Sequence, residues 1–224
     1  MPPVIEIDGL TCYAERGRVI FEDAGLVLNA GEKAVITAPL ASGKSLLVKI
    51  LSGIVVPDKG TVRIFGEDIG GLSKDRLNGV RKRMGFVFHD NVLISNLKVI
   101  ENVALPLLYH TDLPSDEVME RALELLKLTG FAGDIWALPG PLPVYSRKEV
   151  SLAKALALDP EVLVCENLSY GLTGEELQNL FDLVIKYHKG RKDSLLLMTA
   201  LSDAEINLVK PDRAIRIQGN RFVE

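Results

Sequence analysis

Short apolar runs alternate with longer amphipathic segments along most of the chain. The runs KAVITA (33–38), EVLVCE (161–166) and SLLLMTA (194–200) have the length and aliphatic composition of buried strands. Apolar positions recur with helical spacing in 45–53, which a glycine closes, and in 175–188. This alternation of strand and helix predicts an α/β fold whose sheet is largely parallel, with helices on both faces.

The first third and the middle of the chain follow two other patterns. Apolar and polar positions alternate in VIEIDGLTCY (4–13) and again in VIFEDAGLVL (19–28), and a turn-prone ERG separates them. This pattern predicts an antiparallel part at the amino-terminal end. Helical patterns dominate the middle of the chain, and we expect an inserted helical subdomain over about 91–158. Residues 1–224 are expected to form a single domain.

Composition and charge narrow the possible classes of function. The net charge of -4 and the isoelectric point near 5.5 give no reason to expect nucleic acid as a partner. Cys12 and Cys165 belong to no CxxC pair, which fits a reducing compartment. The segment MPPVIEIDGL has no basic or long apolar region, and no run approaches the roughly 18 apolar residues of a membrane span. We therefore expect a cytoplasmic protein that reaches the inner face of the cell membrane through a partner.

The octet APLASGKS (38–45) joins a predicted strand to a predicted helix. It fits the phosphate-binding pattern GxxxxGK[ST], except that alanine replaces the first glycine. In such a loop, backbone N–H groups and the helix dipole hold the phosphates, the lysine reaches the β and γ phosphates and the serine hydroxyl ligates Mg²⁺. A strand-to-helix turn with a solvated lysine is the alternative. The residues expected to bind nucleotide here are Ala38, Pro39, Leu40, Ala41, Ser42, Gly43, Lys44, Ser45 and Leu46.

Three further stretches carry a resemblance that covers about 4–223. GFVFHDNVLISNLKVIENVALPL (85–107), SRKEVSLAKALALDPEVLVCE (146–166) and YGLTGEE (170–176) resemble ABC-type ATP-binding subunits, especially the ATPases of bacterial lipid-asymmetry and solvent-resistance importers. The resemblance implies a P-loop NTPase fold of the ABC type, with a mixed central sheet, an antiparallel amino-terminal part and a helical subdomain. It also implies ATP and Mg²⁺ as ligands, a transmembrane permease as partner, and a homodimer or a heterodimer with another ATP-binding subunit.

The same resemblance assigns roles to single residues. Tyr13 occupies the place of the aromatic residue that stacks on adenine, although a core tyrosine is the alternative. Glu166 stands where an aspartate organises Mg²⁺. His89 stands in the Q-loop place, where a glutamine contacts the metal, the attacking water and the transmembrane partner, although an ordinary loop residue is the alternative. The expected metal-binding set is Ser45, His89 and Glu166.

Several positions depart from the family pattern. LPVYS (142–146), before a helix expected to begin near Arg147, replaces the signature LSGGQ or LSGGM, so a proline stands where a serine offers its hydroxyl and N–H to a partner's phosphate. Asn167 is at the general-base position and cannot accept a proton, and Ala200 replaces the switch histidine. Thr173 replaces the D-loop aspartate. An alanine such as Ala41, where the family has glycine, costs about 1–2 kcal/mol if its φ is positive, which predicts weak nucleotide binding.

These observations favour a degenerate ABC transporter subunit. It would bind ATP·Mg weakly, hydrolyse it little or not at all because no catalytic residue is intact, and dock on a permease. One alternative is an active ATPase that couples hydrolysis to transport of a lipid or another solute, with Glu166 or another carboxylate as the base. A second alternative is a regulatory or structural interaction module that no longer uses nucleotide. A small-molecule kinase or a GTPase is disfavoured, since we find neither a lid nor NKxD.

Overall fold

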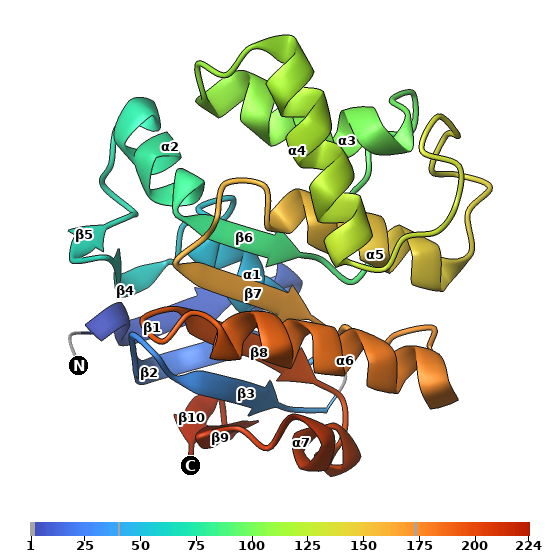
Figure 1. Cartoon of the computed structure of the whole chain (residues 1–224). Coiled ribbons are helices and arrows are strands. Elements are labelled where there is room, and N and C mark those ends of the chain that lie inside the picture. Colours follow the sequence, from blue (N-terminus) through green and yellow to red (C-terminus); the bar gives the residue numbers. More distant parts are fainter. Residues whose placement is uncertain (1–2, 40, 173) are drawn as a thin grey trace.

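The computed structural model describes residues 3–39, 41–172 and 174–224. These residues form two β-sheets with helices packed around them (Figure 1). The strands are β1 (Pro3–Tyr13), β2 (Val19–Asn29), β3 (Lys33–Thr37), β4 (Lys59–Ile64), β5 (Glu67–Asp68), β6 (Met84–Val87), β7 (Val162–Glu166), β8 (Leu195–Ala200), β9 (Arg213–Gln218) and β10 (Arg221–Val223). The helices are the 3-10 turn η1 (Glu15–Gly17), α1 (Lys44–Leu51), α2 (Lys74–Lys82), α3 (Val99–His110), α4 (Ser115–Leu128), α5 (Val144–Ala155), α6 (Gly174–Lys189) and α7 (Asp203–Val209).

The central sheet has the order β10-β9-β3-β8-β7-β6. Strands β9, β3, β8, β7 and β6 run parallel, and β10 forms an antiparallel hairpin with β9. The predicted parallel sheet is therefore confirmed. The carboxyl ends of β3, β7 and β8 lie at one edge of this sheet, because residues 37, 166 and 199–200 are neighbours in register. In an open α/β sheet this edge is where ligands bind.

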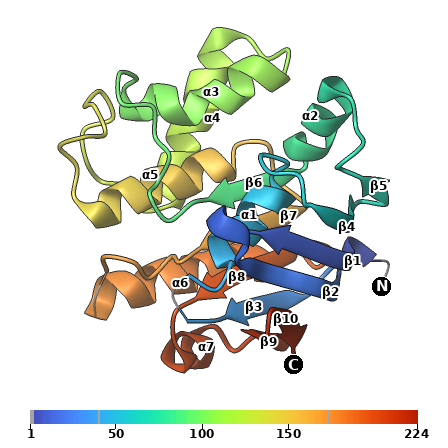
Figure 2. The same cartoon turned by 180° about the vertical axis from the view of Figure 1, so that it is seen from behind.

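The second sheet contains β2-β1-β4-β5 and is antiparallel throughout. It confirms the antiparallel part predicted at the amino-terminal end. Its buried residues share one hydrophobic core with α1 and with one face of the central sheet, which contributes Ala34 and Ile36. Val35, between them, points to the opposite core, as the alternation of a strand requires. The two views show α1 between the two sheets and α6 on the other side of the central sheet (Figures 1 and 2).

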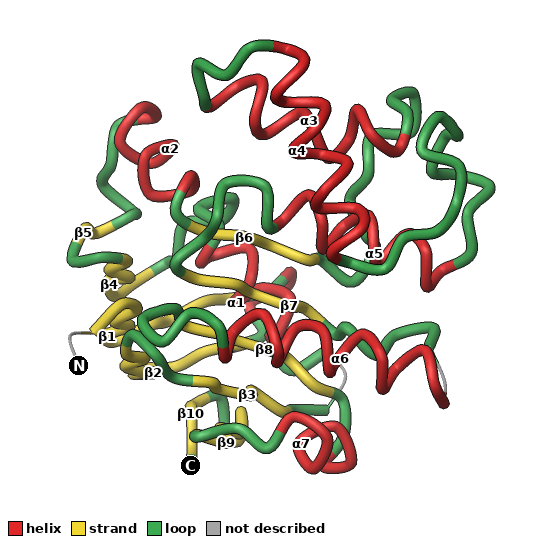
Figure 3. Tube along the Cα trace, in the orientation of Figure 1, coloured by secondary structure: helices red, strands yellow, loops and turns green. Residues whose placement is uncertain are grey.

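Helices α3, α4 and α5 pack on one another beside the β6 and β7 end of the central sheet (Figure 3). Helix α5 begins at Val144, three residues before the start near Arg147 that the sequence predicts. Pro143 explains the difference, since it has no N–H that needs an intrahelical partner and its φ of -52° suits the residue before a helix. Among the described residues, we find no helix with the length and apolar character needed to traverse a bilayer.

Candidate functional site: a cavity at the β3–α1 loop

The loop after β3 leads directly into α1, as the octet pattern predicts. Gly43 is the residue before the helix and has a φ of 98°. A Cβ atom built on it would lie 2.6 Å from Ile20 Cγ2 and 2.9 Å from Phe21 Cζ, so only glycine fits. Phe21 is itself stacked on Phe222 with ring centroids 5.4 Å apart. Strand β2 therefore sets the shape of this turn, while Leu40 lies outside the described residues.

Ala41 and Lys44 show what the loop does to its own residues. Ala41 has a φ of 61°, so the left-handed conformation that the missing glycine would suit is imposed on an alanine. The Lys44 side chain is buried, and its Nζ donates hydrogen bonds to the carbonyls of Ala38 and, at 3.2 Å, of Pro39. Burial lowers the pKa of Lys44, and the charge of Glu205 raises it. The ammonium therefore lies inside the curve of the loop, where a phosphate would meet it.

A cavity of about 600 Å³ opens beside this loop. It joins the end of β1, the loop, the first turn of α1 and the residues that follow β7 and β8. Three of its side chains are cationic and one, Glu15, is acidic, which suits a phosphate-bearing ligand. Tyr13 lies at its mouth and is 45% exposed, so it is not a core tyrosine. The lining residues are Tyr13, Ala14, Glu15, Arg18, Ile20, Pro39, Ala41, Ser42, Gly43, Lys44, Ser45, Leu46, Lys49, Asn167 and Leu201.

Glu166 and His89 lie next to each other but are not part of the cavity lining. Glu166 ends β7, is 3% exposed, and its Oε1 lies 3.4 Å from His89 Nδ1. No hydrogen-bond donor among the described residues reaches that oxygen. A buried carboxylate oxygen that accepts no hydrogen bond from the described residues, with His89 Nδ1 as its neighbour, fits a cation such as Mg²⁺. The described residues include no group of three or more His, Cys, Asp or Glu side chains that would hold a metal without other ligands.

Asn167 lines the cavity where a general base is expected, and its own hydrogen bonds hold it against β8. Its φ is 43°, and its N–H donates to Thr199 O at 3.2 Å and to Thr199 Oγ1 at 3.0 Å. The Thr199 hydroxyl is 3.3 Å from the amide oxygen of Asn167. Ala200 is buried at the end of β8 and offers no polar atom from its side chain. Thr173 lies outside the described residues. The side chains of Asn167 and Ala200 therefore supply no general base.

The start of α5 has apolar contacts in place of phosphate-binding groups. Val144 packs on the turn after β7, because a Cβ atom built on Gly171 would lie 3.1 Å from Val144 Cγ1. Tyr145, one residue later, is half-buried. Pro143 has no N–H to donate, and no side chain caps the helix.

The structure also shows functional candidates that the sequence reasoning missed. Arg18 and Lys49 line the cavity, although no motif marks them. Glu205, from the unpredicted helix α7, accepts hydrogen bonds from Leu201 N at 3.0 Å and from Ser169 Oγ at 2.9 Å. The tetrapeptide SDAE (202–205) has the capping-box pattern and was an available signal for this helix. Glu205 accepts its hydrogen bond from Leu201 N, one residue before the Ser202 N–H that a capping box would use.

Comparison with known proteins agrees with this geometry. The model of the ABC transporter family matches residues 21–167, from β2 to the residue after β7. The probable ribonucleotide transport ATP-binding protein Mkl of Mycobacterium tuberculosis (strain CDC 1551 / Oshkosh) is 33% identical over 195 residues, which are 87% of this chain and 54% of that protein. The intermembrane phospholipid transport system ATP-binding protein MlaF of Haemophilus influenzae is 33% identical over 161 residues, which are 72% of this chain and 61% of that protein.

Solved structures share the fold over nearly the whole chain. The ATP-binding cassette MJ0796, solved as a dimer in a post-hydrolysis state bound to ADP and Pi, superposes with a TM-score of 0.89 at 24% identity and covers 98% of this chain and 97% of its own. CbiO1 of Clostridium perfringens, part of the complex cbiONQ, gives a TM-score of 0.85 at 22% identity and covers 100% of this chain and 88% of its own. The chain thus spans between half and two thirds of the two curated relatives but nearly all of these cassettes. With a family match from β2 to the β7 end and a loop of the phosphate-binding pattern between them, the chain belongs to the ABC transporter family, as one of its ATP-binding domains.

Proposed function

We propose that this chain is a degenerate ATP-binding subunit of an ABC transporter, which binds ATP·Mg weakly, hydrolyses it little or not at all, and docks on a membrane permease. One observation carries the proposal. A single cavity holds the phosphate-binding Lys44 and, on its β7 side, Asn167 in place of a carboxylate. The groups that bind phosphate are thus retained beside a position that has lost its base.

Weak binding follows from the loop's own conformation. Ala41 occupies a left-handed φ of 61°, which costs an alanine about 1–2 kcal/mol relative to glycine. Lys44 already donates to two loop carbonyls, so a phosphate exchanges these hydrogen bonds for new ones. Tyr13, exposed in the cavity lining, would stack on a base. Ser45 in the lining, with the nearby pair His89 and Glu166, would hold the metal.

Loss of hydrolysis follows from the amide side chain at the general-base position and from the surroundings of the other carboxylates. A positioned general base contributes about 10²- to 10⁴-fold in rate, and an amide at position 167 supplies none. The active-ATPase alternative needs another carboxylate that is free to accept a proton. Glu166 faces His89 outside the cavity lining, both oxygens of Glu205 already accept hydrogen bonds, and Glu15 lies at the Tyr13 end of the cavity. The interaction-module alternative needs the cavity to be filled, whereas it remains about 600 Å³ in volume.

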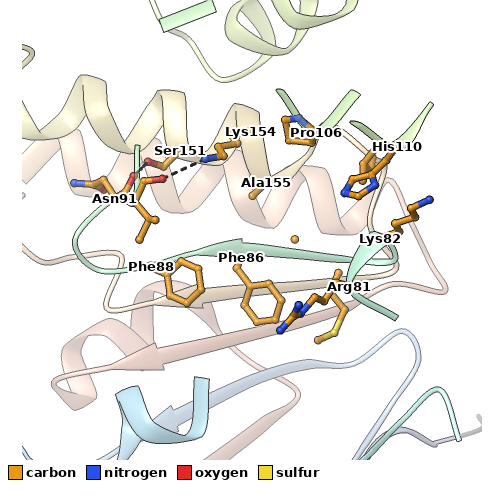
Figure 4. A pocket seen from close by; sticks show the side chains of 14 residues that line it. Arg81, Lys82, Phe86, Phe88, Asn91, Pro106, His110, Ser151, Lys154 and Ala155 are labelled. Carbon is orange, nitrogen blue, oxygen red and sulfur yellow. Dashed lines mark hydrogen bonds between the residues drawn. The ribbon is translucent and has the colours of Figure 1, made fainter. Parts of the chain in front are cut away.

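A second hollow, a groove lined by β6 and the helices around it, supports docking on a permease. It lies between α2, β6, α3 and α5, and the stacked rings of Phe86 and Phe88, 5.6 Å apart, line its floor (Figure 4). Cationic or titratable side chains surround the rings, and none of the lining residues is acidic. A cytoplasmic permease segment with an apolar side chain between acidic ones is the occupant that this lining complements. The residues that supply positive charge are Arg81, Lys82 and Lys154, whereas burial and the charge of Lys82 lower the pKa of His110.

The relatives suggest the setting of such a subunit. MlaF is named for intermembrane phospholipid transport, and Mkl for probable ribonucleotide transport. MJ0796 is described as dimeric. We infer that this chain works as a homodimer or as a heterodimer with another ATP-binding subunit, at the inner face of the membrane through its permease. In a heterodimer, an active partner would supply its own signature loop to the Lys44 cavity, and the site built from 142–146 would stay silent.

Two measurements on the purified chain test the proposal. Mg·ATP should raise the melting temperature of the wild type and leave that of Lys44→Ala unchanged, while phosphate release stays at the level of Lys44→Ala for both. Lys44-dependent turnover would support the active ATPase instead. A wild type that shows no melting shift up to millimolar ATP would support the module that does not use nucleotide.

A further inference from the structure

Glu205 joins two loops at the edge of the cavity and has no role in the proposed function. Its side chain is 7% exposed. One oxygen accepts the N–H of Leu201, which follows β8, and the other accepts the hydroxyl of Ser169, in the turn after β7. Acceptance at both oxygens is the hydrogen-bonding pattern of an ionised carboxylate. The chain therefore holds a fixed negative charge directly behind these two loops.

The loops that Glu205 holds form one wall of the nucleotide cavity. Leu201 lines the cavity, and so does Asn167, which starts the turn that contains Ser169. Lys44 lines the same cavity. The electrostatic relation agrees, because burial lowers the pKa of Lys44 while the charge of Glu205 raises it. Glu205 is thus an anionic neighbour of the lysine that a terminal phosphate would contact.

From this arrangement we propose that the Glu205 carboxylate makes the cavity select nucleoside diphosphate over nucleoside triphosphate. The first two phosphates are held by the N–H groups at the start of α1 and by its dipole, away from the β7 and β8 loops. A third phosphate would enter between Lys44 and the wall that Glu205 supports. It would bring further negative charge towards a buried carboxylate, where water screens the repulsion poorly. The inference rests on the proposed function, since it concerns the ligand of the same site.

Calorimetric titration of the full chain with ADP and with ATP, each with and without Mg²⁺, tests this directly. We expect the wild type to bind ADP about tenfold more tightly than ATP, as one nearby charge in a partly buried site implies. Glu205→Gln keeps an acceptor for Leu201 and a hydrogen bond to Ser169 while it removes the charge. It should raise ATP affinity about tenfold and leave ADP affinity nearly unchanged.

Two matched variants separate charge from hydrogen bonding and position. Ser169→Ala removes one hydrogen bond and keeps the charge, so the ratio of ADP to ATP affinity should stay as in the wild type. Glu15→Gln removes an exposed carboxylate from the Tyr13 end of the same cavity, so it should move both affinities together. If Glu205→Gln fails to fold, the ratio of ADP to ATP affinity in the wild type still tests the proposal.

The possible outcomes distinguish this inference from the proposed function. A wild type that binds ATP as tightly as ADP overturns the selectivity and leaves weak nucleotide binding intact. A Glu205→Gln variant with weaker Mg·ATP binding overturns it as well, and makes Glu205 a ligand of the metal. A wild type that binds neither nucleotide overturns both proposals.

Discussion

Helices α1 and α5 both follow a loop that binds phosphate in ABC ATP-binding domains. The first residue of α1 is charged, and the first residue of α5 is apolar. Helix α1 follows Gly43, and its first residue, Lys44, turns its charge into the loop beside the cavity. Helix α5 follows Pro143, and its first residue, Val144, packs on Gly171. Neither helix has a side-chain cap at its start. The two helix starts therefore differ in backbone and in surroundings, since Gly43 has a φ of 98° beside a cavity and Pro143 a φ of -52° near the turn that contains Gly171.

This difference teaches that the fold depends on the helices and not on the chemistry at their starts. Helix α5 remains in the core through Val150, Leu152 and Ala153, which are fully buried. A helix kept in place by its apolar face can exchange polar residues at its first turn at small cost. The following predictions test the contrast, in order of decreasing effect.

Removing the Lys44 ammonium should remove most of the nucleotide affinity that distinguishes the start of α1 from that of α5. Lys44→Ala should weaken nucleotide binding about 100-fold, because a charge-assisted hydrogen bond to phosphate is lost in a buried position. Isothermal titration with ADP measures this. Lys49→Ala is the matched control, since Lys49 lines the same cavity but is exposed, and it should cost only a few-fold. Equal losses in both variants would mean that the loop has no special position for its lysine.

A pH titration of stability sharpens the contrast at α5, whose first turns face inward. Burial raises the pKa of Glu149 to about 7, hydrogen bonds from Tyr145 and Ser146 lower it, and the charge of Glu176 raises it. The folded state thus binds a proton that the unfolded state releases near pH 4.5. The contribution of Glu149 to the free energy of unfolding is therefore largest below pH 4.5. It falls as the pH rises through 7, by on the order of 3 kcal/mol.

Urea unfolding of the wild type and of Glu149→Gln between pH 5 and 7.5 measures the effect. The amide cannot ionise, so the difference between the two curves should grow with pH. This range avoids Lys148, whose pKa burial lowers to about 8, since its contribution changes above that pH. Parallel curves for the two proteins would contradict a buried, titrating Glu149.

Restoring a family residue at α5 should cost stability and gain no ligand binding. Val144→Gly removes the packing on Gly171 and weakens the first helical turn, for a loss of about 1–2 kcal/mol in the free energy of unfolding. Thermal denaturation checks this, and Val144→Ala separates the lost contact from the lower helix propensity of glycine. An unchanged melting temperature for Val144→Gly would show that this contact does not stabilise α5.

Relieving the backbone strain at Ala41 should raise nucleotide affinity at the α1 loop, and this is the smallest of the expected effects. Ala41→Gly suits a φ of 61° and should raise nucleotide affinity about fivefold. Ala38→Gly is the matched control, because Ala38 also replaces a family glycine but does not have a positive φ. A similar gain in both variants would mean that side-chain bulk, and not backbone strain, weakens binding.

The sequence predicted those parts of the molecule that local patterns determine. Strands β3, β7 and β8 have apolar runs that no other element of that length shows, and the octet lies between one of them and α1 as expected. The roles of Tyr13 and Asn167 came from a family pattern, and both residues line the cavity. Their chemistry stays a prediction, as does the metal-binding role of His89.

The parts that were missed depend on contacts between distant segments. The early start of α5 places Val144 against Gly171, which is 27 positions away. Glu205 reads as an ordinary surface residue until Ser169, from the turn after β7, and Leu201, which follows β8, are hydrogen-bonded to it. No periodicity encodes such hydrogen bonds, because they are fixed by tertiary structure.

The tight fit of Gly43 against Ile20 and Phe21 has a consequence for how substitutions in this protein will be felt. Phe21 of β2 stacks on Phe222 of β10, so the loop takes its curvature from rings in two different sheets that do not line the cavity. Trimming either ring should alter nucleotide affinity, and trimming the fully buried Phe21 should lower the melting temperature as well. Screens for nucleotide binding in this chain will therefore recover variants outside the cavity lining, among them some that lose stability.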